Sequence, residues 1–344
     1  MTTSTTPSQA VVVIVNPLGG TLKHYTDGVT AALRGDGHHV VVESIFEPCV
    51  AGGTALAWLG RYVRALLRAR RTARQADGRV LVTWPVLGHL DRPLVRAALG
   101  RHTPADIVMH DPEPLVHARG YTRLARYVAS LIRSVSVVAH SAAATRILER
   151  HCPNTPLTQL PHPVLPRRIA ESQDDQNAMP VVRVLGQFKP DRDVHMLRDL
   201  ATKIDNDVRL EIVGRGWPAV AGWQVEDTYV SEERLDELMA TADAVLVPYR
   251  RFFQSGIAFR ALELGTPAVG PLDSSMAELY THDQFLASDC VDSWAAAVAA
   301  AIETSPSDVN DIATNLGASA QSDWGTWARG AKRTAARTDH NPTI

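Results

Sequence analysis

The segment AVVVIVNPLGGTLKHYTDGVTAALRGDGHHVVVESI, residues Ala10–Ile45, decides the fold class. It opens with an apolar run that ends at Asn-Pro and continues into a Gly-Gly turn. Helical spacing then runs through Val29 and Leu33 to a Gly-Asp-Gly stop, and a second apolar run follows. Strand, glycine turn, helix and strand form a βαβ unit, which requires a parallel sheet.

The same alternation of strands and helices continues along the whole chain and is interrupted once. The interruption is the polar stretch PRRIAESQDDQNAMP, which has a proline at each end and is typical of a linker. We therefore predict an α/β protein with two tandem Rossmann-like domains and an inter-domain cleft, lined by loops from the carboxyl ends of both sheets. The expected parts are an N-terminal domain (1–165), a linker (166–180), a C-terminal domain (181–315), a helix crossing back (316–336) and a tail (337–344).

Composition and cysteine usage exclude several classes of protein. The 344 residues are 45% hydrophobic and 21% charged with a net charge of −2, which is ordinary for a globular chain. The three cysteines show no CxxC spacing, which argues against a zinc knuckle or disulfide scaffold and fits a reducing cytosol. The first ten residues lack a signal-peptide core, and the sequence contains no run of 18 apolar residues.

Charge is distributed unevenly between the two halves. Residues 1–165 contain 18 Lys and Arg against 10 Asp and Glu, and the remainder contains 17 against 27. The basic excess is concentrated in RYVRALLRARRTAR, which holds no acid. On a helix, Tyr62 and Leu66 would form one face and most arginines another. This basic face is either solvated or lies on an anionic membrane through Arg61, Arg64, Arg68 and Arg71.

Two loops after strands carry groups suited to an anion. Gly19 and Gly20 precede a helix, so their N–H groups and the helix field favour negative charge, although a plain βα turn explains them equally. In GQFKPDRD, Lys189 and Arg192 follow the first strand of the second domain. These two residues would neutralise a diphosphate, or they are two ordinary surface cations.

The stretch PYRRFFQSGIAFRALELGTPAVG, residues 248–270, places Tyr249 and Arg250 after a buried strand and Ser255-Gly256 at a helix start. Ser is a good N-cap and Gly permits close approach, so this end suits a phosphate or a sugar hydroxyl, or is a simple cap. His110 ends a first-domain strand, where it could bond a sugar hydroxyl or move a proton.

The sequence lacks the motifs that mark several classes of enzyme. The sequence has no HExxH motif, and we expect no protein-built metal site and no metal cofactor. A G-x-S-x-G elbow is absent, which disfavours a hydrolase. The G-x-G-x-x-G fingerprint is also absent, which disfavours a nicotinamide dehydrogenase.

Taken together, these stretches resemble the GT-B glycosyltransferases, in particular bacterial enzymes near glycosyltransferase family 4. VLGQFKPDRDV is similar to the family's Gly-Gln-Ile-Arg-Pro-Tyr-Lys-Gly signature, and SGIAFRALELGTPAVGP to its Ser-Gly branch. The resemblance implies a nucleotide-sugar donor on the second domain and an acceptor on the first. The implied donor contacts are Lys189, Arg192, Tyr249, Arg250, Ser255 and Gly256, with Gly19 and Gly20 across the cleft and His110 beside the transferred sugar.

One departure from the family pattern concerns two glutamates eight positions apart. Phe252 and Arg260 stand at their positions, and Glu263 is out of register. The expected function is a cytosolic, membrane-peripheral glycosyltransferase that moves a hexose from a GDP- or UDP-sugar to a hydroxyl of a glycan or lipid-linked acceptor. Two alternatives stay open: a catalytically inactive sugar-nucleotide-binding protein, which the lost glutamates motivate, and a GT-B sugar-nucleotide epimerase.

Overall fold

The computed structural model describes residues 9–114, 118–166, 179–250, 253–280 and 282–336, without the side chains of 331–336. Most of the predicted linker and the whole predicted tail lie outside these residues. The chain divides into two compact units, Met1–Pro163 with Ala318–Ile344, and Val164–Gly317.

The first unit is built on a six-stranded sheet in the order β2-β1-β3-β4-β5-β6. All of its neighbouring strands pair in parallel, as the opening βαβ unit predicts. Its central strands are buried on both faces, which explains their continuous apolar runs. The strands are β1 (Val11–Asn16), β2 (His39–Ser44), β3 (Arg79–Val82), β4 (Ala105–Val108), β5 (Val135–Ala139) and β6 (Leu157–Gln159).

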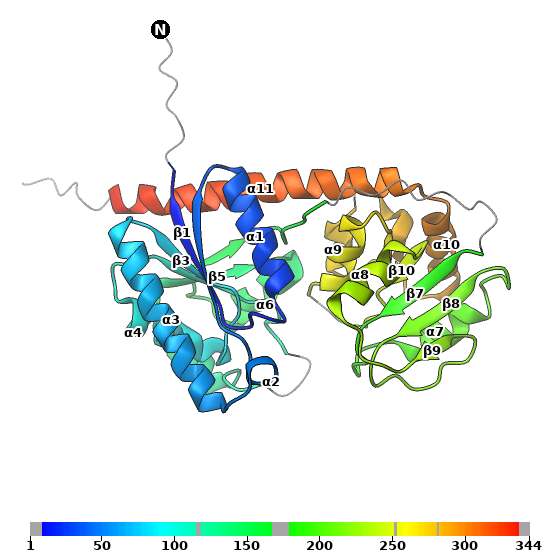
Figure 1. Cartoon of the computed structure of the whole chain (residues 1–344), viewed down its shortest axis with the longest axis horizontal. Coiled ribbons are helices and arrows are strands. Elements are labelled where there is room, and N and C mark those ends of the chain that lie inside the picture. Colours follow the sequence, from blue (N-terminus) through cyan, green and yellow to red (C-terminus); the bar gives the residue numbers. More distant parts are fainter. Residues whose placement is uncertain (1–8, 115–117, 167–178, 251–252, 281, 337–344) are drawn as a thin grey trace, which may run out of the picture. The chain divides into compact units, whose positions relative to one another are not determined.

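Helices cover the two faces of this sheet with separate apolar cores (Figure 1). One core joins Tyr62 and Leu66 to the sheet, and the other joins Val29, Leu33 and Trp324 to the opposite face. The helices of this unit are α1 (Lys23–Gly35), α2 (Pro48–Ala51), α3 (Ala55–Gln75), the 3-10 turn η1 (Gly88–Leu90), α4 (Asp91–Leu99), α5 (Arg123–Ser130) and α6 (Ala142–His151).

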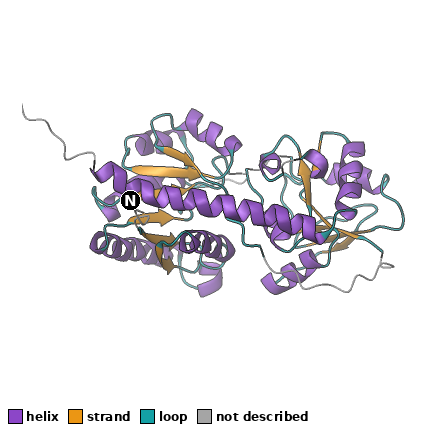
Figure 2. Cartoon of the chain, turned by 90° about the horizontal axis from the view of Figure 1, so that it is seen from above, coloured by secondary structure: helices purple, strands orange, loops and turns teal. Residues whose placement is uncertain are grey.

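The second unit repeats this plan with a parallel sheet in the order β12-β11-β10-β7-β8-β9. Figure 2 distinguishes the strands from the helices that surround them. Its strands are β7 (Val181–Leu185), β8 (Arg209–Val213), β9 (Gln224–Glu226), β10 (Ala244–Leu246), β11 (Ala268–Pro271) and β12 (Leu286–Ala287). Its helices are α7 (Val194–Ala201), α8 (Glu232–Ala240), α9 (Gly256–Glu263), η2 (Ser275–Glu278), η3 (Asp283–Phe285) and α10 (Val291–Ile302). The segment SSMAELY forms only the 3-10 turn η2.

The last helix, α11 (Pro306–Ala336), begins earlier than the expected residue 316. Proline is favoured at the first position of a helix, and the Ser305 hydroxyl before it accepts a hydrogen bond from the Asp308 amide at 3.2 Å. From Ala318 onward the helix belongs to the first unit, where Trp324 and Trp327 pack on the sheet.

Candidate functional site

Three exposed cations follow three neighbouring strands of the second sheet. Lys189 comes after β7, Arg215 after β8 and Arg250 after β10. Because β7 lies between β10 and β8 and all three run in parallel, their carboxyl ends meet at one edge of the sheet. The amide of Phe188 donates to the Arg215 carbonyl at 2.9 Å, which joins two of these loops. Arg215 was not among the candidate site residues predicted from the sequence. The segment VGRG directly after an apolar strand could have indicated it.

The three cations differ in whether a carboxylate of the protein already pairs with them. Arg250 donates to both carboxylate oxygens of Asp193, at 3.0 and 3.1 Å, and these hydrogen bonds lower the pKa of Asp193. Lys189 and Arg215 have no carboxylate within ion-pair distance in the part of the chain that the structure describes. These two side chains are therefore the better candidates for an anionic ligand.

Arg192 occupies a different environment from the one predicted. Only 4% of the residue is exposed, and its guanidinium lies between the rings of Trp217 and Tyr249, 5.0 and 4.8 Å from their centroids. It donates to the Leu185 carbonyl at 2.8 Å, and burial lowers its pKa. The alternative that Arg192 is an ordinary surface cation is therefore wrong, because the buried arginine holds the loops of the edge together.

The helix start at Ser255 agrees with the local geometry expected from the sequence. Ser255 caps α9, and its hydroxyl accepts a hydrogen bond from the Ala258 amide at 3.3 Å. Gly256 is exposed, and a Cβ placed there would meet nothing within 4 Å. Among the described residues, no acceptor faces the Gly256 and Ile257 amides. A helix start of this kind favours an anion.

The carboxyl edge of the first sheet carries a cluster of aromatic and imidazole rings. His110, His140 and His162 follow β4, β5 and β6, and all three are buried. Tyr25 of α1 packs against all three, with ring centroids 4.7, 5.4 and 5.2 Å away respectively. Trp84, which follows β3, stacks on His110 at 5.4 Å.

Hydrogen bonds hold the rings of His110 and His140 in place, and burial favours the neutral form of His140 and His162. Nε2 of His110 donates to the Thr83 carbonyl at 3.0 Å, and Nδ1 of His140 donates to the Leu160 carbonyl at 2.8 Å. Burial lowers the pKa of His140 to about 3 and that of His162 well below its usual value. Neutral imidazoles of this kind suit hydroxyl groups better than anions.

The sequence predicts that the Gly19-Gly20 loop offers its amides to an anionic ligand, but these amides already have partners within the protein. The Gly19 amide donates to the Ile45 carbonyl at 2.9 Å. The Gly20 and Thr21 amides donate to the two carboxylate oxygens of Glu47, at 3.1 and 2.9 Å. Burial raises the pKa of Glu47, but the hydrogen bonds from Thr21 and Gly20 outweigh it and lower the pKa overall. The predicted anion site therefore already holds a carboxylate of the protein itself.

No protein-family model matches the chain, and no curated protein sequence matches it either. Solved structures do match over nearly the full length. AviGT4, a glycosyltransferase involved in avilamycin A biosynthesis, superimposes with a TM-score of 0.61 at 17% identity, covering 94% of this chain and 98% of its own. HepE from Anabaena, in complex with UDP and glucose, gives 0.60 at 15% identity, covering 96% and 100%. The chain has the GT-B fold.

A third GT-B structure of similar likeness is the UDP-forming trehalose-phosphate synthase from Burkholderia xenovorans, in complex with glucose-6-phosphate. It gives a TM-score of 0.62 at 12% identity, covering 95% of this chain and 100% of its own. At these identities the likeness concerns the fold. The two parallel six-stranded sheets are the GT-B arrangement that the sequence predicts.

Helix α9 includes a position at which the sequence differs from the glycosyltransferase family 4 pattern. Arg260, at the position of the second glutamate, is buried and pairs with Asp236 at 2.5 Å and with Glu232. It therefore ties α9 to α8. Glu263 is also engaged, since its carboxylate accepts a hydrogen bond from the Leu165 amide at 2.7 Å. Phe252, at the first glutamate position, lies outside the described residues.

Within the described ranges, no three His, Cys, Asp or Glu side chains gather in a way that could hold a metal ion. In the same residues, every helix is too short or too polar to span a bilayer.

Proposed function

We propose that the protein is a glycosyltransferase that moves a hexose from a UDP- or GDP-sugar to a hydroxyl of a glycan or lipid-linked acceptor. The observation that carries this proposal is the pair of unneutralised cations, Lys189 and Arg215, at the same sheet edge as the open amides of α9. When the glycosidic bond to the diphosphate breaks, negative charge grows on the leaving diphosphate. Cations and helix amides fixed in advance stabilise that charge.

The other residues of this edge have supporting roles in the proposal. Ser255 and Gly256 offer a hydroxyl and an amide to a phosphate or sugar oxygen. Arg250 adds charge at the rim while Asp193 holds its side chain. Arg192 positions Tyr249 rather than touching the diphosphate. A metal ion is not required in this arrangement, so chelation of divalent cations should leave transfer unchanged.

The acceptor side of the proposal rests on the first unit. His110 lies in a buried cluster of aromatic and imidazole rings at the carboxyl edge of the first sheet. We propose that it lies beside the transferred sugar, where an imidazole can hydrogen-bond a hydroxyl or move a proton. The HepE complex with UDP and glucose and the synthase complex with glucose-6-phosphate support a sugar donor and a sugar acceptor in general.

Replacing Lys189 and Arg215 with alanine should weaken binding of the matching nucleoside diphosphate. A charge-assisted hydrogen bond contributes about 1.5–3 kcal/mol, so we expect each replacement to raise Kd about ten-fold or more. The wild-type chain is first screened by thermal shift with UDP, GDP, ADP, TDP and CMP, and the selected ligand is then titrated calorimetrically. Arg234→Ala, an exposed arginine of α8, is the matched control.

Unchanged affinity in both variants would remove this edge from the donor site. A donor that binds the wild type but is neither hydrolysed nor transferred would instead favour the inactive sugar-nucleotide-binding protein. Arg260, held by two acidic side chains at a glutamate position, is the observation that keeps this second candidate open.

We also propose that the first unit contacts an anionic membrane through Arg61, Arg64, Arg68 and Arg71 of α3. Tyr62 and Leu66 are buried in the core, so the apolar face of α3 expected from its sequence is not free to insert. Apolar side chains near the arginines are nevertheless exposed, namely Phe46, Val50 and Leu56. Arg68 is partly neutralised by Glu43 at 2.7 Å.

This membrane contact predicts salt-dependent vesicle binding. Replacing Arg64 and Arg71 with glutamate should abolish co-sedimentation with vesicles rich in phosphatidylglycerol, because each basic residue near such a surface contributes about 1 kcal/mol. Arg146→Glu and Arg150→Glu on α6 provide a control with the same change of charge. Wild-type protein that stays in solution at low salt would end this part of the proposal.

A further inference from the structure

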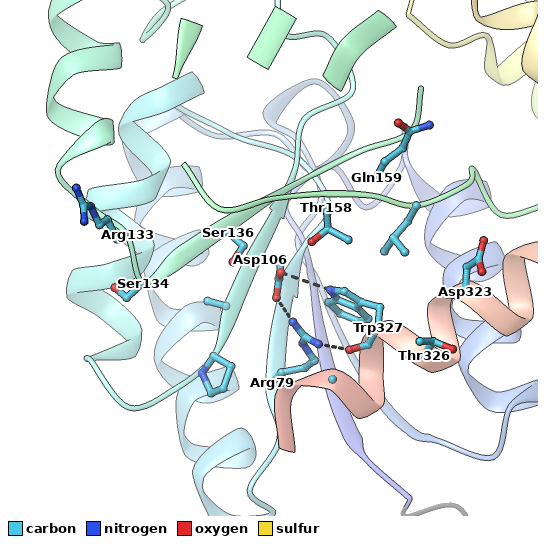
Figure 3. Close-up of a pocket in the computed structure, with 14 residues that line it drawn as sticks. Arg79, Asp106, Arg133, Ser134, Ser136, Thr158, Gln159, Asp323, Thr326 and Trp327 are labelled. Atoms are coloured by element: carbon cyan, nitrogen blue, oxygen red, sulfur yellow. Dashed lines mark hydrogen bonds and ion pairs between the residues drawn. The ribbon is translucent and has the colours of Figure 1, made fainter. Parts of the chain in front are cut away.

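An open cavity of about 860 Å³, lined by both polar and apolar groups, lies on one face of the first sheet, next to α11 (Figure 3). Its position follows from the alternation of side chains along the strands. Val108 and Val138 face α11 in the apolar core, so residues two positions earlier, Asp106 and Ser136, lie on the same face. The face is therefore apolar toward the carboxyl ends of the strands and polar toward their amino ends, where the cavity opens.

One wall of the cavity is a buried network of three side chains. Arg79 of β3 donates to Asp106 of β4 at 2.7 Å and to the Trp327 carbonyl of α11, and its guanidinium lies 3.7 Å from the Trp327 ring centroid (Figure 3). Trp327 also donates its indole N–H to Asp106 at 3.4 Å. The charges of Arg79 and Asp106 cancel, so this wall is electrically neutral. Nε of Arg79 is buried without a partner in the described chain.

The remaining lining includes the apolar residues Pro104, Ala105 and Leu160. Its polar part consists of hydroxyl, amide and charged groups from β5 and the turn before it, from β6 and from α11. In the described part of the chain, the hydroxyls of Ser134, Ser136 and Thr158 and the carboxylate of Asp323 have no hydrogen-bond partner. Thr326 and Gln159 complete the rim. Arg133 and Asp323 carry opposite charges, so the rim has no net charge that would select an anion.

From this lining we propose that the cavity binds a neutral polyhydroxyl ligand, a monosaccharide or the end of an oligosaccharide. Sugars present many hydroxyl groups that both donate and accept, and the unpaired hydroxyls and carboxylate here can meet both roles. The volume falls in the usual range of small-molecule sites, about 300–1,000 Å³. The site lies away from the carboxyl edge of its own sheet, so it is independent of the proposed transferase function.

The test is saturation-transfer difference NMR on the full chain with glucose, galactose, mannose, maltotriose and glucose 6-phosphate, without any nucleotide. Thr158→Phe fills the cavity from β6 and should abolish the sugar signals. Asp323→Asn is the milder variant on the exposed face of α11, and it should weaken binding about ten-fold because a charge-assisted hydrogen bond is lost. Ser322→Phe, an exposed neighbour outside the lining, is the control, and circular dichroism checks that each variant folds.

Signals from a neutral sugar that vanish in Thr158→Phe, weaken in Asp323→Asn and persist in Ser322→Phe would establish the site. Stronger binding of maltotriose than of the monosaccharides would assign it to a glycan chain, and equal binding to a free sugar. The proposal is overturned if no neutral sugar binds, if only glucose 6-phosphate binds, or if the signals survive both cavity variants. None of these results depends on nucleotide binding, so the donor edge is judged separately.

Discussion

Trp324→Ala is expected to lower the free energy of unfolding of the first unit by about 3–5 kcal/mol. The side chain is fully buried between α11 and the sheet, with its ring centroid 5.3 Å from that of Trp327. Its indole N–H donates to the Pro161 carbonyl at 3.1 Å. Truncation removes the buried surface and the hydrogen bond together, and it leaves a cavity that the neighbouring rings cannot fill.

Urea unfolding, followed through hydrogen exchange of the β1 and β3 amides, measures this loss in the first unit alone. Tyr127→Ala, an aromatic residue of α5 that is 64% exposed, serves as the control and should change stability little. If the two variants lose the same stability, α11 is not a structural part of the first sheet's core.

Asp91→Asn is expected to make the protein more stable at alkaline pH but not at acid pH. Burial raises the pKa of Asp91 from its ordinary 3.8 to about 7. At a pH between 3.8 and about 7, Asp91 is protonated in the folded chain but ionised in the unfolded chain. The stability that this proton supplies is complete at low pH and is lost as the pH rises through about 7.

Asparagine reproduces the protonated carboxyl at this site. Tyr62 faces one oxygen of Asp91 at 2.9 Å with a hydroxyl that can donate or accept, and the Leu87 amide donates to the other oxygen. At pH 8 the variant should therefore exceed the wild type by up to about 4 kcal/mol, since each pKa unit corresponds to about 1.4 kcal/mol.

Thermal and urea unfolding of both proteins between pH 4 and pH 8 isolates the contribution of Asp91, because the titration of the buried histidines cancels in the difference. A stability difference that does not change across this range would show that Asp91 is ionised in the folded protein.

The sequence predicted the two-sheet architecture because that architecture depends on local patterns. Apolar runs, glycine turns and helical spacing each lie within one short segment, and the order of segments then implies a parallel sheet. The short strand β9 (Gln224–Glu226) was missed because it lies at the edge of the sheet with mostly exposed side chains and carries no apolar signal.

The candidate site was harder to predict because its contacts join distant segments. Nothing near Arg192 in the sequence shows that Trp217 and Tyr249 will enclose it. Likewise, the carboxylate that occupies the Gly20 amide comes from Glu47, beyond the next strand. Residue type and position after a strand predict which side chains lie at the carboxyl edge of the sheet. They cannot distinguish a side chain that faces a ligand from one that faces a neighbouring loop.

The division of α11 between the units has a consequence for biosynthesis. A ribosome makes the whole of Val164–Gly317 before it makes Ala318 and the tryptophans that follow. During that time one face of the first sheet is covered by α1 but still lacks α11. The amino-terminal unit, although synthesised first, therefore completes its folding last, and the part of this face that α11 will cover is a natural binding site for chaperones on the nascent chain.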